Sequence, residues 1–220
     1  MNLPPVQLRV LGSLLEKEAT TPDTYPLSLN ALAAACNQLS NRDPVMELSE
    51  IEVRNAVNAL RQESLVRAIQ PAGSKVMKFQ HLLTDTLNLD ARERAVLCVL
   101  LLRGPQTLAE IRARTNRLAE FGSPQDADAT IAALRQRDLA TEMPRRPGQK
   151  EARYAQLLGG PPGDANDMSD AMTDAAVEQV VAGSRGAHAD RIAELESTID
   201  EIRREIAELR ERFEDFQRQF

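Results

Sequence analysis

A short segment near residue 55 carries the side chains best suited to reading nucleic acid. Arginine and asparagine recur there at helical spacing, at Arg54, Asn55, Asn58 and Arg61. Arginine hydrogen-bonds guanine edges, asparagine pairs with adenine, and both contact phosphate. Lys75 and Lys78 follow in a predicted hairpin, where contacts to a nucleic-acid backbone are expected. These six residues are our candidates for a nucleic-acid surface.

The same segment also admits a plainer interpretation. The solvent-facing side of any helix carries polar residues of these types. Glu50, Glu52 and Glu63 belong to the same predicted helix, and their carboxylates would repel phosphate. The sequence leaves both interpretations open.

A second group of cations surrounds a predicted turn at Pro147-Gly148. Its members are Arg145, Arg146, Lys150 and Arg153. Four cations on one hairpin are suited to holding phosphates or to accepting an acidic protein helix. The helix before this hairpin begins with Asp126 and Asp128, which disfavour base reading and suit the helix dipole. This region is therefore predicted to clamp a partner rather than to read bases.

Residues for catalysis or metal binding form no recognisable pattern. The two histidines, His81 and His188, have no cysteine or histidine neighbours at the spacing of a zinc site. Glycine-rich phosphate-binding motifs and the Gly-x-Ser-x-Gly motif are absent. Cys36 and Cys98 lie within apolar helical patterns and are predicted to be buried free thiols. We expect a protein without enzymatic activity, metal or cofactor.

A degenerate internal repeat organises the first 158 residues. Three segments recur in the same order, with offsets that shrink along the chain. They are Val10-Leu11-x-x-Leu14-Leu15 with Val96-Leu97-x-x-Leu100-Leu101, Ser28-Leu29-x-x-Leu32 with Thr107-Leu108-x-x-Ile111, and Ala59-Leu60-Arg61-Gln62 with Ala133-Leu134-Arg135-Gln136. One fold is therefore predicted twice, with shorter loops in the second copy.

Each copy is predicted as three helices followed by a two-stranded hairpin. The helix signals of the first copy are apolar spacing over residues 5–18, an N-cap at Ser28, and a capping box at Ser49-x-x-Glu52. Those of the second are Asp90-x-x-Glu93, Thr107-x-x-Glu110, and Ser123 followed by Pro124. The predicted strands are residues 65–69 and 76–79, then 139–143 and 152–157.

Three helices and a hairpin are the arrangement of a winged helix, a helix-turn-helix variant whose third helix faces the partner. We therefore predict a mainly α fold with small β-hairpins, made of two tandem winged-helix domains plus a C-terminal coiled-coil helix. The first domain spans residues 1–84 and the second spans residues 85–158.

The remaining chain divides into a linker and a heptad segment. Residues 159–187 are rich in Gly, Asp, Ala and Ser and are predicted to be a flexible linker. Residues 188–220 are predicted to be a coiled coil, because apolar residues recur there at strict 3-4 spacing. These are Ile192, Leu195, Ile199, Ile202, Ile206, Leu209, Phe213, Phe216 and Phe220. Self-association through residues 192–220 is predicted, with fold-back onto the chain or docking on another protein as the alternatives.

Charge and hydropathy set the cellular context. The net charge of −6 resides in the tail, because residues 159–220 carry 7 basic and 15 acidic side chains. The part before it is close to neutral, which neither requires nor excludes nucleic acid. No run of 18 apolar residues occurs, and the N-terminus lacks the pattern of a signal peptide. We expect a cytoplasmic protein that does not enter membranes.

Several longer motifs are specific enough to compare with known families. They are Thr20-Thr21-Pro22-Asp23-x-Tyr25-Pro26-Leu27-Ser28-x-Asn30, Ala35-Cys36-Asn37-Gln38-x-Ser40-Asn41-Arg42-x-Pro44-Val45-Met46-x-Leu48-Ser49-Glu50, Leu100-Leu101-Leu102-Arg103-Gly104-x-Gln106-Thr107, Arg117-x-x-Glu120-Phe121 and Pro147-Gly148-x-Lys150-Glu151-x-Arg153-Tyr154. Together they resemble the YceH family of uncharacterised bacterial proteins. The resemblance spans about residues 5–158 and implies tandem winged helices in a bacterial cytoplasm, with no assigned activity. Within it, the polar run 37–44 is interpreted first as a cap and loop tether, and second as a binding surface.

Two functions from different classes follow. The first is a dimeric DNA-binding or DNA-associated regulatory protein, which contacts the duplex through its third helix and its second hairpin. The second is a protein–protein interaction adaptor that uses its winged helices as docking modules. For a third class, a small-molecule sensor, the sequence shows no pocket.

Overall fold

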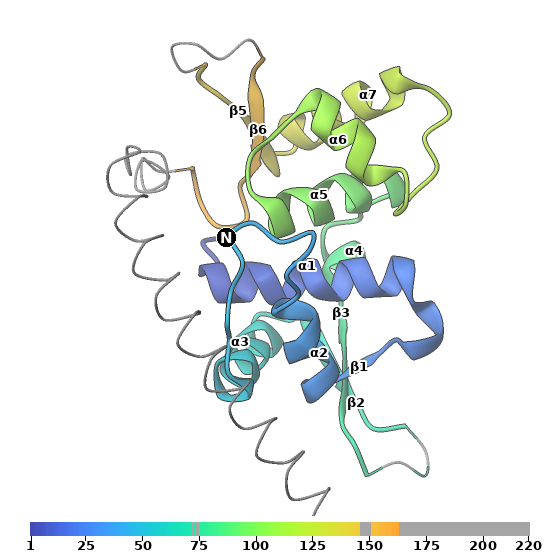
Figure 1. The fold of residues 1–220 in the computed structure, drawn as a ribbon, viewed down its shortest axis with the longest axis vertical. Coiled ribbons are helices and arrows are strands. Elements are labelled where there is room, and N and C mark those ends of the chain that lie inside the picture. The colour runs from blue at the N-terminus through green and yellow to red at the C-terminus, as the bar shows by residue number, and fades with distance from the viewer. Residues whose placement is uncertain (72, 74, 146–150, 163–220) are drawn as a thin grey trace, which may run out of the picture. The chain divides into compact units, whose positions relative to one another are not determined.

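The computed structural model describes residues 1–71, 73, 75–145 and 151–162, which belong to one compact unit, Met1–Gly163. Helices dominate this part of the chain, and two small antiparallel sheets accompany them (Figure 1). The predicted mainly α fold with small β-hairpins is confirmed for these residues. The predicted coiled coil at 188–220, and all of the linker beyond residue 162, lie outside the described residues.

The first half contains three helices and a three-stranded sheet. Its elements are α1 (Pro5–Thr20), the 3-10 helix η1 (Pro22–Thr24), β1 (Leu27–Ser28), α2 (Leu29–Cys36), α3 (Glu50–Gln62), β2 (Val66–Ile69) and β3 (Lys78–His81). The strand order is β1-β3-β2, with all pairs antiparallel. Lys78 lies opposite Ser28 on one side and Ile69 on the other. The strand before α2 is thereby joined to the hairpin after α3.

The second half repeats this order after a short connecting helix. Its elements are α4 (Leu83–Thr86), α5 (Ala91–Arg103), β4 (Gln106–Thr107), α6 (Leu108–Thr115), α7 (Pro124–Gln136), β5 (Ala140–Met143) and β6 (Arg153–Gln156). The strand order β4-β6-β5 matches that of the first half. The predicted repeat is therefore present as a repeated arrangement of helices and strands.

The predicted helix starts agree with the structure. Ser28 accepts a hydrogen bond from the amide of Ala31 at the start of α2. Capping boxes at Ser49, Asp90 and Thr107 open α3, α5 and α6. Each cap accepts hydrogen bonds from amides that have no partner inside the helix. These bonds join residues at most three positions apart, so the helix starts could be predicted from short segments of sequence.

Two details of the strand prediction are wrong. The second strand of the first hairpin begins at Lys78 rather than at residue 76, and Val76 and Met77 before it have 54% and 42% of their surfaces exposed. The third strand of each sheet was missed. With two residues each, β1 and β4 are too short to show an alternating pattern.

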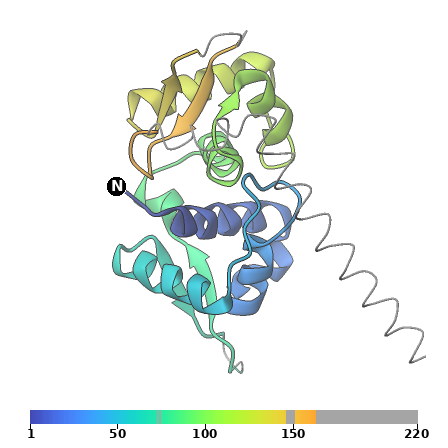
Figure 2. The same ribbon diagram turned by 60° about the vertical axis from the view of Figure 1, so that its left-hand side comes forward.

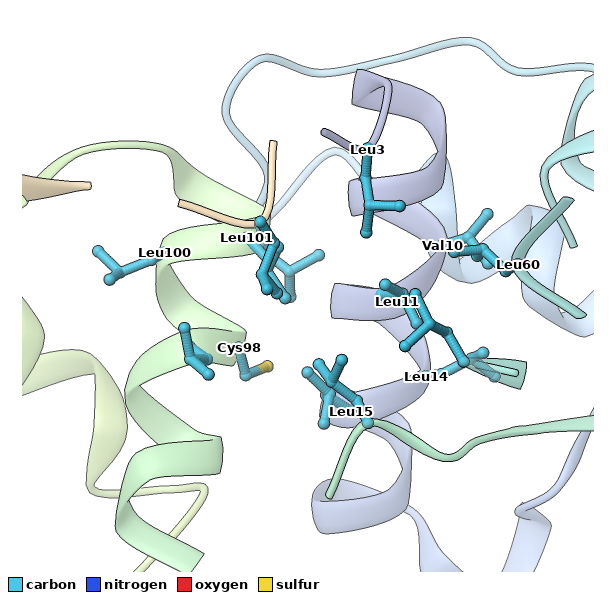
Figure 3. Close-up of a cluster of buried hydrophobic side chains, with 14 of the residues drawn as sticks. Leu3, Val10, Leu11, Leu14, Leu15, Leu60, Cys98, Leu100 and Leu101 are labelled. Carbon is cyan, nitrogen blue, oxygen red and sulfur yellow. The ribbon is translucent and has the colours of Figure 1, made fainter. Parts of the chain in front are cut away.

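Helix α1 occupies the centre of the unit. Residues 9–16 are all buried, polar members included. Val10 meets Leu60 of α3 on one side of the helix, and Leu101 and Cys98 of α5 face it from the other (Figure 3). The leucines of this cluster are buried, as Leu11 is with 0% of its surface exposed. Burial of one such side chain stabilises the fold by about 1.5–3 kcal/mol.

Helices α1 and α5 meet at a glycine. A Cβ atom added to Gly12 would lie 2.8 Å from Leu102 Cδ2 and 3.1 Å from Leu101 Cβ. The Cys98 thiol donates to the carbonyl oxygen of Gly12 across this contact at 3.6 Å. The missing side chain therefore lets the two backbones approach, and the first helices of both halves share one hydrophobic core.

Two backbone hydrogen bonds reinforce this contact. The amide of Leu3 donates to the carbonyl oxygen of Leu158 at 2.9 Å, and that of Asp43 donates to the carbonyl oxygen of Leu102 at 2.8 Å. Leu3 and Leu158 are both buried at 3% exposure. The first residues of the chain are thus held by the last residues of the second half.

No helix within residues 1–71, 75–145 and 151–162 is both long enough and apolar enough to cross a bilayer.

Enlarging Gly12 tests the packing of α1 on α5. We expect Gly12→Val to lower the free energy of unfolding by about 1–3 kcal/mol, because the added methyls overlap Leu102 in a packed core. Urea denaturation measures the change. Ala132→Val, on the exposed face of α7, is the control and should cost less than about 0.7 kcal/mol, the helix-propensity difference. Equal costs in the two variants would contradict a tight contact at Gly12.

Candidate nucleic-acid interface

Helix α3 separates its apolar and polar residues cleanly. Its buried side consists of Val53, Ala56, Val57 and Leu60. Its predicted contact residues Arg54, Asn55, Asn58 and Arg61 are all exposed. The capping box between Ser49 and Glu52 fixes where the helix starts, so the register of these side chains follows from local sequence. The structure therefore places the four candidates of α3 at the surface.

A groove of about 480 Å³ brings three of them together with α2 and β3. Its lining is Ser28, Leu29, Asn30, Glu50, Arg54, Asn58, Arg61, Val76, Met77 and Phe79. Asn55 does not line this groove. Lys78 stands on β3 between Met77 and Phe79, and Lys75 is exposed in the preceding turn. The start of α2, the outer side of α3 and the first hairpin thus form one surface.

The charges of this surface are available to a partner. No carboxylate of the described residues forms an ion pair with Arg54 or Arg61, and Arg61 Nη1 donates weakly to Asn58 Oδ1 at 3.4 Å. The Glu52 carboxylate, which was expected to repel phosphate, accepts hydrogen bonds from the amide and hydroxyl of Ser49. These bonds lower the pKa of Glu52, so it stays ionised at the start of α3. The groove offers two guanidinium groups and two amides, with the Glu50 carboxylate at its lining, beside an apolar floor.

The cations of the second hairpin are not equivalent. Arg145 is exposed just after β5. Arg153 on β6 is half-buried, donates to the carbonyl oxygen of Pro105 at 2.9 Å and lies 3.6 Å from the Glu110 carboxylate. Arg146 and Lys150 lie outside the described residues. Of the two described cations, only Arg145 projects without a partner in the part of the chain that the structure covers.

The start of α7 is occupied by internal contacts. Asp126 accepts hydrogen bonds from Gly122 and Ser123 and forms an ion pair with Arg92 at 3.2 Å. Asp128 binds Arg112 of α6. The carboxylates that disfavoured base reading by this helix therefore have a structural role.

The two hairpins point to opposite ends of the unit. In both Figure 1 and Figure 2, β2 and β3 lie at one end, β5 and β6 lie at the other, and α1 and α5 run between them. The surface around α3 and the second hairpin therefore cannot face the same short stretch of a straight partner.

A hydrogen-bonded loop positions α3. The Asn37 side chain donates to the carbonyl oxygen of Leu48 at 2.7 Å and accepts from the amide of Leu48 at 2.8 Å. Arg9 of α1 donates to the carbonyl oxygens of Cys36 and Pro44. The first interpretation of the polar run 37–44, that it tethers the loop after α2, is confirmed by these bonds.

A buried ion pair anchors the same loop to α1. Arg42 Nη2 lies 2.7 Å from Glu16 Oε2, and the two side chains are 0% and 2% exposed. The other carboxylate oxygen of Glu16 accepts from Arg117 at 2.6 Å. Burial alone would raise the pKa of Glu16, but the hydrogen bond and charge of Arg42, with Lys17 and Arg117, outweigh it and lower that pKa. Glu16 thus stays ionised at the centre of the unit.

Sequence reasoning missed Arg9 and Glu16 as buried charges. On one isolated helix both fall where a polar residue faces solvent. Only the cover supplied by the second half and by the loop 37–48 buries them. Cys36 and Cys98 are buried free thiols as predicted, and burial raises the pKa of Cys98 to about 12. Among the described residues, no group of three or more metal-ligating side chains gathers in one place.

Comparison with known proteins identifies similar chains but no activity. The family model described as "Protein of unknown function, DUF480" matches residues 3–149. A UPF0502 protein of Citrifermentans bemidjiense is 45% identical over 214 residues, which cover 96% of this chain and 94% of that protein. A UPF0502 protein of Pelobacter propionicus is 46% identical over 224 residues, covering 100% and 99%. The family resemblance seen in the motifs is confirmed by these matches.

The buried pair gives a prediction for acid stability. Because the folded-state pKa of Glu16 lies below its ordinary value of 4.5, the unfolded chain binds the proton first as the pH falls. The stabilisation by this carboxylate is therefore complete above about pH 4.5 and is lost as the pH falls through the folded-state pKa. Glu16→Gln should cost about 3–5 kcal/mol at pH 7, because Arg42 is left buried without a counter-charge.

Urea unfolding at pH 7 and from about pH 6 down to about pH 3, which includes the onset of the acid loss, measures both effects. Glu142→Gln removes the partner of Arg135 in an exposed pair and should cost at most about 1 kcal/mol. Arg117→Gln is the second variant if Glu16→Gln fails to fold: the acid transition should move to higher pH. If the wild type and Arg117→Gln lose stability at the same acid pH, Arg117 does not contribute to the ion-pair network of Glu16.

Proposed function

Because the chain belongs to the DUF480 family, whose description assigns no activity, we propose its function from the geometry: a non-catalytic, DNA-binding regulatory protein that contacts the duplex through α3. The observation that carries this proposal is the placement of Arg54, Asn58 and Arg61 in one groove between α2 and the first hairpin. A helix that presents arginine and asparagine on one side can read base edges in a major groove.

The arrangement of elements supports a winged-helix assignment for each half. In this assignment residues 1–84 and 85–158 are tandem winged-helix domains, α3 and α7 are their third helices, and the hairpins are their wings. The amides at the N-terminus of α2 are suited to binding a DNA phosphate next to the major groove that α3 would occupy. Lys75 and Lys78 supply cations on the wing. The loop of residues 37–49 replaces the tight turn of a simple helix-turn-helix.

The second hairpin serves a separate contact in this proposal. It lies at the opposite end of the unit from α3, so Arg145 would meet a different DNA segment or a different partner. Dimerisation through the heptads of residues 192–220 would place two copies of the α3 surface on one duplex. A symmetric pair of surfaces suits a site with two half-sites. We also propose that the protein acts in the cytoplasm.

The runner-up function is a protein–protein interaction adaptor. One observation favours it: the groove beside α3 is lined by Leu29, Val76, Met77 and Phe79, and Ile51 is 64% exposed nearby on the same helix. Apolar surface of this kind is more typical of a peptide-binding groove than of a phosphate contact. The arginines at its edge would then select an acidic amphipathic segment.

Salt-dependent DNA binding tests the leading proposal. Fluorescence anisotropy of labelled mixed-sequence duplex should show binding at about 50 mM salt that weakens steeply by about 200 mM. Arg54→Gln and Arg61→Gln should each weaken binding and reduce the salt slope by about one, if each arginine contacts a phosphate.

Arg135→Gln is the matched control. Arg135 occupies the position of Arg61 in the second copy of the repeat, but it pairs with Glu142 and lies over the Tyr154 ring. Its loss should change DNA affinity much less. No binding at the lower salt, or equal losses from Arg61→Gln and Arg135→Gln, would remove α3 as the DNA contact and leave the adaptor as the better proposal.

Sedimentation tests the proposed self-association. The full chain should sediment as a dimer or larger species, and a chain ending at residue 183 should sediment as a monomer, because the nine apolar heptad positions are then removed. A monomer in both cases rules out dimerisation by the heptads.

A further inference from the structure

A small pocket with a strongly cationic wall lies away from the α3 surface. It encloses about 170 Å³ where the loop after α2 meets α5 and α6. Its lining is Asn41, Cys98, Val99, Leu102, Arg103, Arg114, Arg117 and Leu118. Three arginines and one amide therefore converge on an apolar floor, which is the composition of a site for a small polar ligand.

The charges around this pocket do not balance. Arg117 pairs with Glu16 at 2.6 Å, but Glu16 is already paired with the buried Arg42. Arg114 pairs with Glu110 at 3.3 Å, and Glu110 also lies beside Arg153. Each of the two carboxylates is thus shared between two guanidinium groups. Like charges this close repel one another, and an anion between them would relieve the repulsion.

Arg103 is the least compensated member of the group. It donates to Asn41 Oδ1, and no carboxylate of the described residues forms an ion pair with it. Burial, followed by the positive charges of Arg114 and Arg117, lowers its pKa. The fold therefore holds an arginine in a place that is unfavourable for its charge. Charged groups whose pKa is shifted by burial and by neighbouring like charges are enriched at binding sites.

The space and the donors match a phosphate group. The pocket, at about 170 Å³, has room for a phosphate group together with a few water molecules. A phosphate carries about −1.5 to −2 charges and three acceptor oxygens, and arginine forks bind it bidentately. Asn41 supplies a side chain that can also donate.

We propose that Arg103, Arg114 and Arg117, with Asn41, form a binding site for a phosphate group, carried either by free phosphate or by a small phosphomonoester. The site joins both halves of the unit, because Asn41 precedes α3 and the arginines belong to the second half. A bound phosphate would tie the loop that positions α3 to α5 and α6. This inference is independent of whether α3 binds DNA.

Calorimetric titration of the full chain tests the site. Inorganic phosphate is added in a phosphate-free buffer at constant ionic strength, and the thermal midpoint is followed in parallel, because a ligand of the folded state raises it. We expect saturable binding of one phosphate per chain. Arg103→Gln should weaken it about tenfold or more, the loss expected for one hydrogen bond to a charged group.

Two further variants make the result specific. Arg114→Gln should also weaken phosphate binding, which keeps the test informative if Arg103→Gln does not fold. Arg112 lies on the same helix as Arg114, but it pairs with Asp128 and does not line the pocket. The Arg112→Gln variant should therefore bind phosphate as tightly as the wild type. Methyl phosphate serves as the smallest monoester. Tighter binding of the ester supports a phosphomonoester ligand, and tighter binding of inorganic phosphate supports the free anion.

Two results would overturn the proposal. The first is an absence of saturable heat and of any midpoint shift in the wild type. The second is an equal response of the wild type, Arg103→Gln and Arg112→Gln, which would show general screening of charge rather than a site.

Discussion

The approach of α1 to α5 at Gly12 determines how the rest of the molecule is arranged. With no side chain at this position, the two backbones come close enough for the Cys98 thiol to reach the Gly12 carbonyl oxygen. Leucines of both helices then fill one continuous core rather than two separate ones. Because each of these helices is the first of its half, their contact joins the two copies of the repeat at equivalent places and directs their hairpins to opposite ends.

Helix α1 is buried on nearly all sides, so its charged residue Glu16 is removed from water and depends on the loop 37–48 for a counter-charge. Glu16 lies in the shared core and needs a counter-charge, which Arg42 supplies from within the loop. The same loop leads directly to Ser49, the cap of α3, so the segment that neutralises Glu16 also fixes the start of the exposed helix. On its far side the loop contributes Asn41 to the arginine-lined pocket. The loop 37–48 therefore connects the hydrophobic core, the α3 surface and the arginine-lined pocket.

Local signals in the sequence were sufficient for the three main helices of each half and for the exposed side of α3, but not for the short helix α4. Caps such as Ser49 and Asp90 act within one turn, so they can be read without knowing the fold. Contacts between distant segments could not be read in this way. The burial of Glu16 depends on Arg42 and Arg117, which are 26 and 101 residues away. The pocket likewise needs Asn41 and Arg103 in contact, and that pairing joins a loop residue to a helix 62 residues away, which no periodicity indicates.

The central position of α1 also has a consequence for synthesis on the ribosome. Domains fold from the N-terminus as the chain emerges, yet α1 belongs to a core that is completed by α5 and closed by the bond between Leu3 and Leu158. While the first half is outside the ribosome and the second is not, the stripe containing Leu11 and Leu15 has no cover on its α5 side. The nascent protein therefore passes through a stage that exposes apolar surface, the type of surface that holdase chaperones recognise. The hydrogen bond between Leu3 and Leu158 can form only after residue 158 has left the ribosome.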